Sequence, residues 1–202
     1  LYRGSSRGFV AFLNKFRADI FDTVAANWTA AGKTFEQNPK DYKALARFLN
    51  IATGRGPLEF GKVDLTKWGP VLNAAFFSPR LLTSRFALPF EFVATTPEVR
   101  KLMARDLAAF ATTALGIMTV LRAAGAEVES DPRSSDFGKV RFGDTRIDFL
   151  GGYSQISRFV AQEITGEAKT VSAGEIKDAA RGDVIRRFIR SKLAPVASEL
   201  TD

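Results

Sequence analysis

The densest group of residues able to do chemistry is a run of cations near the end of the chain. Its members are Arg181, Arg186, Arg187, Arg190 and Lys192. Guanidinium groups bind phosphate oxygens, so these residues are candidates for a nucleic-acid or lipid-headgroup contact. Cations late in a helix also complement the helix dipole, which is the alternative explanation. Phe188 belongs to the apolar stripe of the same segment, so no aromatic residue interrupts the basic face and a base-stacking platform is not indicated.

A second charged group mixes both signs within Asp131–Gly152. Its charged members are Arg133, Lys139, Arg141, Arg146, Asp131, Asp136, Asp144 and Asp148. Mixed charges among turn-forming residues usually stabilise the local fold through ion pairs and side-chain to backbone hydrogen bonds. A paired-carboxylate active site is not expected, because nothing in the sequence indicates a substrate cleft.

Two missing residue types exclude whole classes of chemistry. The chain has no Cys and no His, so thiolate nucleophiles, disulfides, Cys/His zinc sites and Ser-His-Asp triads are impossible within it. Carboxylates could still bind Mg²⁺ or Ca²⁺, but no segment resembles an EF-hand or a phosphate-binding loop. We therefore expect a segment with no enzymatic activity, no catalytic residue, no metal site and no cofactor.

The charged block contains the only expected β-structure. Lys139–Phe142 and Thr145–Leu150 alternate in polarity, and Gly143-Asp144 between them can reverse the chain into a β-hairpin. On the second segment, Ile147 and Phe149 are expected to face a core while their neighbours face water.

Helix-period segments surround the hairpin on both sides. Apolar residues three and four apart predict a long helix over Ser6–Ala31, and Asn38-Pro39 resembles the start of a second helix that stops at Gly54. A further helix is expected from Tyr153 to Gly166. The last helix is expected to open near Ala173–Glu175 and to run towards Lys192, with Pro195 ending or kinking it.

The segment Trp68–Thr96 is rich in bulky apolar residues and is interrupted by three prolines, so short broken helices are expected. Ser78 is expected to cap a helix whose first residue is Pro79. The segment is interpreted as core, and a surface for another subunit or a bilayer is the alternative. The candidate partner or oligomer interface is formed by Phe76, Phe77, Arg80, Arg85, Phe86, Phe90 and Phe92.

Another helix is expected from about Glu98 to Ala124. Its centre, Leu107–Leu121, contains 15 residues without a charge, fewer than the roughly 17–20 needed to cross a hydrocarbon layer. We interpret it as a buried core helix, with membrane insertion and an oligomer interface as alternatives. The candidate membrane residues are Leu107, Phe110, Leu115, Ile117 and Leu121.

Composition agrees with a folded, helical protein. The 202 residues are 46% hydrophobic, include 18 Phe and carry a formal net charge of +7, which suits contact with phosphates, anionic membranes or acidic partners, or a solvated basic surface. The fold class expected is mainly α, with about six helices, several of them amphipathic, and one small β-hairpin near 139–150. Three segments are expected: 1–54, 55–130 and 131–202. Because the chain begins at Leu1 rather than Met, we expect it to belong to a longer polypeptide.

Three stretches carry a resemblance to a known group of proteins. DPRSSDFGK at 131–139, followed by GDTRID and GGYSQ up to Gln155, is similar to a region of the large polyvalent or internal virion (ejection) proteins of tailed bacteriophages. NAAFFSPRLLTSR at 73–85 and RFIRSKLAPV at 187–196 agree with it. The matches span roughly residues 70–200, and no enzymatic role is attached to any residue in them.

The resemblance implies a structural segment, in the C-terminal region of a longer protein, that is packaged in the virion and aids genome delivery across the host envelope. The partners implied are copies of itself or other virion proteins of the portal, tail or ejection apparatus, with double-stranded DNA and a transient membrane contact as further options. The location implied is the capsid interior or tail, and the host cell envelope after ejection. The alternatives are a tethering domain of a giant virion-packaged enzyme, such as an RNA polymerase, and a basic DNA-binding module.

Overall fold

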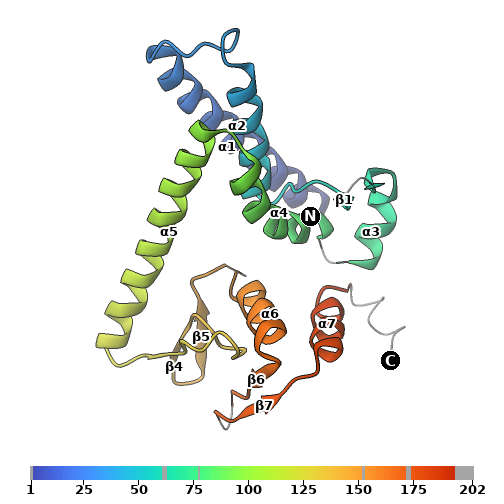
Figure 1. Cartoon of the computed structure of the whole chain (residues 1–202), viewed down its shortest axis with the longest axis vertical. Coiled ribbons are helices and arrows are strands. Elements are labelled where there is room, and N and C mark those ends of the chain that lie inside the picture. The colour runs from blue at the N-terminus through green and yellow to red at the C-terminus, as the bar shows by residue number, and fades with distance from the viewer. Residues whose placement is uncertain (1, 61–62, 77, 152, 172–173, 194–202) are drawn as a thin grey trace. The chain divides into compact units, whose positions relative to one another are not determined.

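The chain is mainly helical, as expected, with 64% of the residues that the structure describes in helices. The computed structural model describes residues 2–60, 63–76, 78–151, 153–171 and 174–193 (Figure 1). The α-helices in these ranges are α1 (Tyr2–Ala30), α2 (Pro39–Ala52), α3 (Gly69–Ala75), α4 (Pro79–Ala94), α5 (Pro97–Ala123), α6 (Tyr153–Thr165) and α7 (Arg181–Arg190). A 3₁₀-helix, Thr66–Trp68, precedes α3.

The described strands form three small antiparallel sheets, where the sequence predicted a single hairpin. They are β1 (Glu59–Phe60), β2 (Val63–Asp64), β3 (Glu127–Val128), β4 (Lys139–Phe142), β5 (Thr145–Asp148), β6 (Glu167–Lys169) and β7 (Ile176–Asp178). β1 pairs with β2, β6 pairs with β7, and β3, β4 and β5 form the three-stranded sheet.

The chain divides into two compact units. Unit 1 contains residues 1–74 and 78–106, and unit 2 contains residues 75–77 and 107–202. The boundary falls inside α5, so one continuous helix belongs to both units. The expected division into 1–54, 55–130 and 131–202 stays a prediction about domain organisation.

Unit 1 is built on the pair of α1 and α2. The chain reverses after α1 at Gly32, whose φ of +78° is a left-handed conformation that glycine adopts without strain. The buried ring of Tyr42 packs edge-on against Trp28, with ring centroids 5.2 Å apart, and its hydroxyl donates a hydrogen bond to the Lys33 carbonyl at 2.7 Å. Tyr42 therefore ties the turn to both helices. Leu45 is fully buried in the same unit.

The segment after α2 confirms the expectation of short broken helices, with one correction. Ser78 occupies the N-cap position of α4 and Pro79 is its first residue, although the Ser78 side chain makes no capping hydrogen bond. Pro89 was expected to interrupt the helix, but α4 continues through it. Pro89 is exposed, so its ring does not have to fit into the packed interior of unit 1.

Unit 2 has its own apolar cluster, in which the end of α5 packs on the three-stranded sheet. Ala114 and Met118 of α5 meet Ala126 and the fully buried Val140 of β4. The predicted hairpin of β4 and β5 is confirmed, and Gly143 takes a φ of +54° in its turn. The inward orientation expected for Ile147 is wrong: every residue of β5 is exposed. β5 is the edge strand of this small sheet and has little to pack against, whereas β4 lies between β3 and β5.

The start of the last helix is a second correction. The sequence predicted a helix from Ala173–Glu175 onwards, with Ile176 on its apolar stripe. Instead, Ile176–Asp178 is strand β7, paired with β6, and α7 begins at Arg181. The spacing of Ile176 and Ala180 fits a helix, but pairing with residues about nine positions earlier in the chain overrides it. Pro195 lies outside the described residues.

Candidate interaction surfaces

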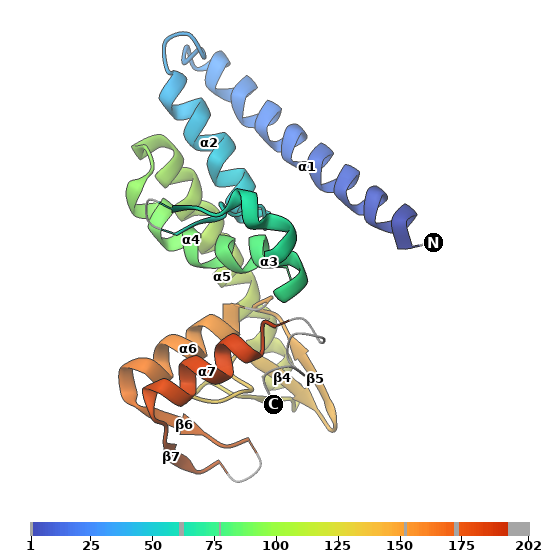
Figure 2. The same ribbon diagram turned by 90° about the vertical axis from the view of Figure 1, so that its right-hand side faces the viewer.

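The first candidate surface is an apolar face on α1. Phe9, Phe12 and Phe16 are 63%, 65% and 45% exposed, and the rings of Phe12 and Phe16 stack with centroids 6.2 Å apart. The helix is 29 residues long and its partner α2 only 14, so α1 extends past α2 in Figure 2. A groove of about 520 Å³ runs beside Phe9 and Leu13 of this helix. The sequence predicted apolar residues three and four apart along this helix. It could not show that Phe9, Phe12 and Phe16 are left uncovered within unit 1.

The second surface lies on α5, where the interpretation as a buried core helix is wrong. Only 11% of its most apolar 18-residue window is buried, and Leu115 and Val120 are 60% and 67% exposed. By length and composition α5 could cross a membrane. The helix packs on the small sheet of unit 2 through one narrow side, because three short strands cannot surround a helix of 27 residues.

The candidate membrane residues differ in exposure along α5. Leu107, Phe110, Leu115 and Ile117 are exposed, whereas Leu121 packs against the apolar cluster of unit 2. A groove of about 500 Å³ is lined by apolar side chains on α5 together with Val128 and Leu150. This side of the helix is a concave apolar surface and not only an apolar stripe.

The residues of the predicted Phe-rich interface belong to both units, and their joint role as an interface stays a prediction. Phe76 belongs to unit 2, where it forms an isolated bridge with Leu193, and the described others belong to unit 1. Phe90 is 75% exposed, whereas Phe86, Phe92 and Arg85 are half-buried. Arg80 donates a hydrogen bond to the Gly56 carbonyl at 3.3 Å and so anchors the segment after α2. Phe77 lies outside the described residues.

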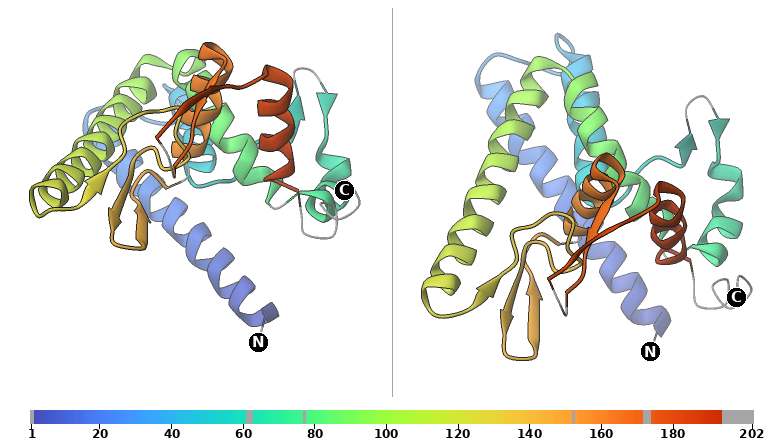
Figure 3. Two further views of the ribbon diagram at one scale, coloured as in Figure 1. Left: turned by 90° about the horizontal axis from the view of Figure 1, so that it is seen from below. Right: turned by 60° about the horizontal axis from the view of Figure 1, so that its bottom comes forward.

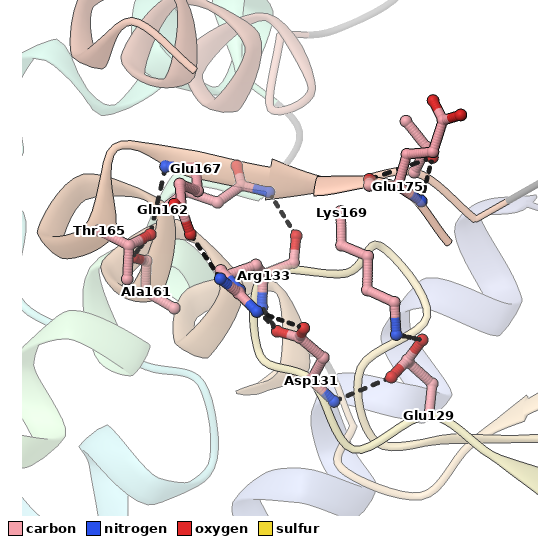
Figure 4. A network of polar contacts seen from close by, with 10 residues as sticks. Glu129, Asp131, Arg133, Ala161, Gln162, Thr165, Glu167, Lys169 and Glu175 are labelled. Carbon is pink, nitrogen blue, oxygen red and sulfur yellow. Dashed lines mark hydrogen bonds and ion pairs between the residues drawn. The ribbon is translucent and has the colours of Figure 1, made fainter. Parts of the chain in front are cut away.

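The mixed-charge block forms a network of ion pairs (Figure 4). Arg133 donates to both carboxylate oxygens of Asp131, at 2.8 and 3.0 Å, and to Glu167 of β6. Lys169 donates to Glu129 at 2.7 Å, and Gln162 of α6 donates to the Arg133 carbonyl at 2.8 Å. The network ties the loop before β4 to α6 and β6. The expected structural role of the mixed charges is therefore confirmed.

Electrostatics in this network favour ionised carboxylates. Hydrogen bonds from the Arg133 side chain, and then from its backbone N–H, lower the pKa of Asp131 to about 2. Burial alone would raise the pKa of Glu129, but hydrogen bonds from Lys169 and from the Asp131 backbone lower it. A general acid needs a pKa near the working pH, so these acids suit ion pairing and not proton transfer. Among the described residues, no group of three or more Asp or Glu could hold a metal ion.

The third surface is the basic helix α7. Arg181, Arg186 and Arg190 are exposed, and Arg186 approaches Asp183 at 3.4 Å. The Lys192 ammonium lies 5.2 Å from the centre of the Phe188 ring. Arg187 turns towards α6 and lines a small pocket there with Arg158.

Arg158 is the residue that the sequence did not reveal. It stands alone among uncharged neighbours in α6, so no charge run marks it. Only the packing of α6 on α7 brings it to Arg187.

No family model, curated protein sequence or solved structure matches this chain. Function must therefore be argued from the three surfaces and from the resemblance carried by residues 73–85, 131–155 and 187–196.

Proposed function

We propose that this chain is a structural segment of a bacteriophage internal virion (ejection) protein, which acts by assembly and aids genome delivery across the host envelope. Its partners are copies of itself or other virion proteins. The resemblance described above supports the virion context. The apolar side chains exposed on α1 and α5 support assembly, and the α1 face is the observation that carries the proposal.

The exposed phenylalanines give assembly a physical cause. Full burial of a large apolar side chain contributes about 1.5–3 kcal/mol, so a Phe that is already half-buried gains about 1 kcal/mol when a partner covers it. Phe9, Phe12 and Phe16 lie on one side of one helix, and their contributions add when a second apolar helix packs there. Isolated exposed apolar residues are ordinary, but a continuous aromatic face on an extended helix is typical of an interface.

The simplest occupant of the α1 face is α1 of a second copy. Two such helices packed face to face form a twofold interface in which each stacked Phe pair covers the other. Lys15 and Asp19, which form an ion pair at 2.9 Å, border the face and keep its edge polar. That arrangement, with an apolar centre and a charged rim, matches the usual anatomy of an interface.

Self-association is tested by sedimentation velocity over a concentration series. We expect the wild-type chain to form oligomers, and the double variant Phe12→Ser/Phe16→Ser to associate at least about tenfold more weakly, because about 1 kcal/mol or more is lost in each copy. The matched control is Ala11→Ser/Ala18→Ser, which adds two serines on the opposite side of the same helix. A wild-type chain that stays monomeric at every concentration would contradict the assembly role.

The virion context needs its own measurement, a mass-spectrometric inventory of purified particles. We expect peptides of this chain in the particles, at a copy number consistent with a ring or another symmetric assembly. Peptides found only in infected-cell lysates, and never in particles, would remove the virion assignment while leaving self-association intact.

A further inference from the structure

A small pocket opens between α6 and α7 in unit 2. The two helices lie side by side in Figure 2 and in Figure 3, and the rings of Phe159 and Phe188 touch across them with centroids 4.5 Å apart. The pocket has a volume of about 140 Å³, and Ser135, from the loop before β4, lines it as well. Arg158 enters from α6 and Arg187 from α7.

Arg158 is a half-buried cation without a partner. It makes no hydrogen bond or ion pair with any residue that the structure describes. Burial lowers its pKa, and the nearby charge of Arg187 lowers that pKa further. Asp136 favours the charged form, but its carboxylate is already held by Lys139 at 2.9 Å and Arg146 at 2.7 Å. The acid whose charge acts on Arg158 is therefore already shared by two other cations.

Arg187 presents a similar excess of positive charge. Its Nε donates to the backbone carbonyl of Asp183 at 3.2 Å, which leaves the two terminal nitrogens of the guanidinium group for another acceptor. The Asp183 carboxylate is 3.4 Å from Arg186 instead. Two guanidinium groups thus share one pocket, and no described carboxylate lines it. An anion in the pocket would convert their repulsion into attraction.

We propose that this pocket binds a phosphate group of a nucleic-acid backbone, held between the guanidinium groups of Arg158 and Arg187. Guanidinium groups bind phosphate oxygens through pairs of parallel N–H donors, which suits two arginines that approach one anion. A pocket of about 140 Å³ can take a phosphate group but not a base pair. The site is independent of assembly, because none of its residues lies on α1 or α5.

A polymer of phosphates fits the surroundings better than one free phosphate does. Arg186 and Arg190 lie one helical turn apart on the exposed side of α7, next to the pocket, and Lys192 follows. Arg186 and the two pocket arginines outnumber Asp183 and Asp136, so one small anion would neutralise only part of the charge. A chain of phosphates can occupy the pocket and the exposed cations together.

An anionic membrane is the competing ligand, because Ile185 and Ile189 are exposed on α7. The geometry favours nucleic acid over it. Val184 is buried and Phe188 half-buried, so the apolar side of α7 already faces α6. Arg158 also lies in a recess, which a phosphate on a flexible strand reaches more readily than the flat surface of a bilayer.

The test is fluorescence anisotropy with a labelled double-stranded oligonucleotide of about 20 base pairs, repeated over a range of salt concentrations. We expect Arg158→Gln and Arg187→Gln each to weaken binding by about five- to tenfold and to reduce the salt dependence of log K by about one. The matched control is Lys177→Gln, which removes one exposed charge from β7 of the same unit. It should change the affinity less than about twofold.

Folding is checked on the same variants. Arg158→Gln should not lower the unfolding midpoint, because it removes a half-buried charge that faces another cation. Inorganic phosphate, compared with chloride at equal ionic strength, should raise the midpoint of the wild-type chain and not that of Arg158→Gln. If Arg158→Gln fails to fold, Arg187→Gln remains as the test, because Arg187 is exposed.

Three outcomes would overturn the proposal. The first is a wild-type chain that does not bind the oligonucleotide, or binds it without salt dependence. The second is equal affinity for Arg158→Gln and Lys177→Gln. The third is binding that depends on Arg158 for vesicles of phosphatidylglycerol but not for DNA, which would assign the pocket to a lipid headgroup.

Discussion

At the residue scale, nearby cations can have opposite roles. Arg133 is enclosed by Asp131 and Glu167, and these hydrogen bonds raise its pKa and bind three segments together. Arg158 has no such partner, and its pKa is lowered. A cation whose charge is satisfied within the protein stabilises the fold, whereas one left in a pocket without an acid is available to a ligand.

The pairing of Asp131 predicts a dependence of stability on pH. Its folded pKa of about 2 lies below its ordinary value of 3.8, so the ionised carboxylate stabilises the fold above pH 4. That contribution is lost as the pH falls from about 4 to about 2. We expect Asp131→Asn to lower the unfolding midpoint by about 2–4 °C at pH 6 and to converge with the wild type as the pH falls through that range. Circular dichroism during heating measures the unfolding midpoints of the variant and of the wild type at each pH.

The control for this prediction is Asp144→Asn, which removes an exposed carboxylate from the turn between β4 and β5. It should leave the midpoint at pH 6 unchanged to within about 1 °C. A difference between Asp131→Asn and the wild type that stays constant from pH 6 to pH 2 would show that the ion pair is not its cause.

At the element scale, one glycine sets the distance between α4 and the segment that follows α2. A Cβ atom at Gly56 would lie 2.3 Å from the backbone nitrogen of Ser84 and 2.6 Å from its Cα. The Gly56 N–H also donates to the Arg80 carbonyl at 3.2 Å. Two backbones meet here, and a rotamer change cannot relieve a clash between them.

We therefore expect Gly56→Ala to lower the free energy of unfolding by about 1–3 kcal/mol. The matched control is Gly8→Ala in α1, where nothing lies within 4 Å of the added methyl group. Alanine favours a helix over glycine, so this control should be neutral or stabilising by up to about 1 kcal/mol. Urea denaturation of both variants measures the difference, and equal effects would contradict the close approach.

At the scale of the whole molecule, the described residues form an apolar centre in each of the two units. Leu45 is fully buried in unit 1, and Met118 belongs to the apolar cluster of unit 2. Each centre is assembled from residues of its own unit. Stability should accordingly be distributed between the units and not uniform along the chain.

Hydrogen exchange can test this division. We expect Leu45→Ala to destabilise unit 1 by about 2–5 kcal/mol and Met118→Ala to destabilise unit 2 by an amount at the lower end of that range, because Met118 borders an open groove. Each substitution should reduce amide protection chiefly in its own unit. Within α5, Leu45→Ala should affect the part up to Asp106, and Met118→Ala the part after it. Uniform loss of protection in both units would show that the chain unfolds as one cooperative body.

Elements whose bounds depend on neighbouring residues were predicted well from the sequence. Apolar spacing of three and four indicated α1, α5 and α6, and Pro39 and Pro79 each begin a helix as expected. The turn at Gly143-Asp144 was indicated by the same kind of local signal. Backbone restrictions of proline and glycine act within a few residues, so they can be recognised without knowledge of the fold.

The tertiary structure alone decided which apolar faces are covered and which charges meet. The same apolar spacing describes α2, whose Leu45 is fully buried, and α5, most of whose surface is exposed. Pairing with β6 makes Ile176–Asp178 a strand, and the packing of α6 on α7 brings Arg158 close to Arg187. Burial, strand pairing and the contact of two like charges each require a partner from elsewhere in the chain. Local spacing therefore determined the helices, whereas long-range packing determined the surfaces on which the proposed function depends.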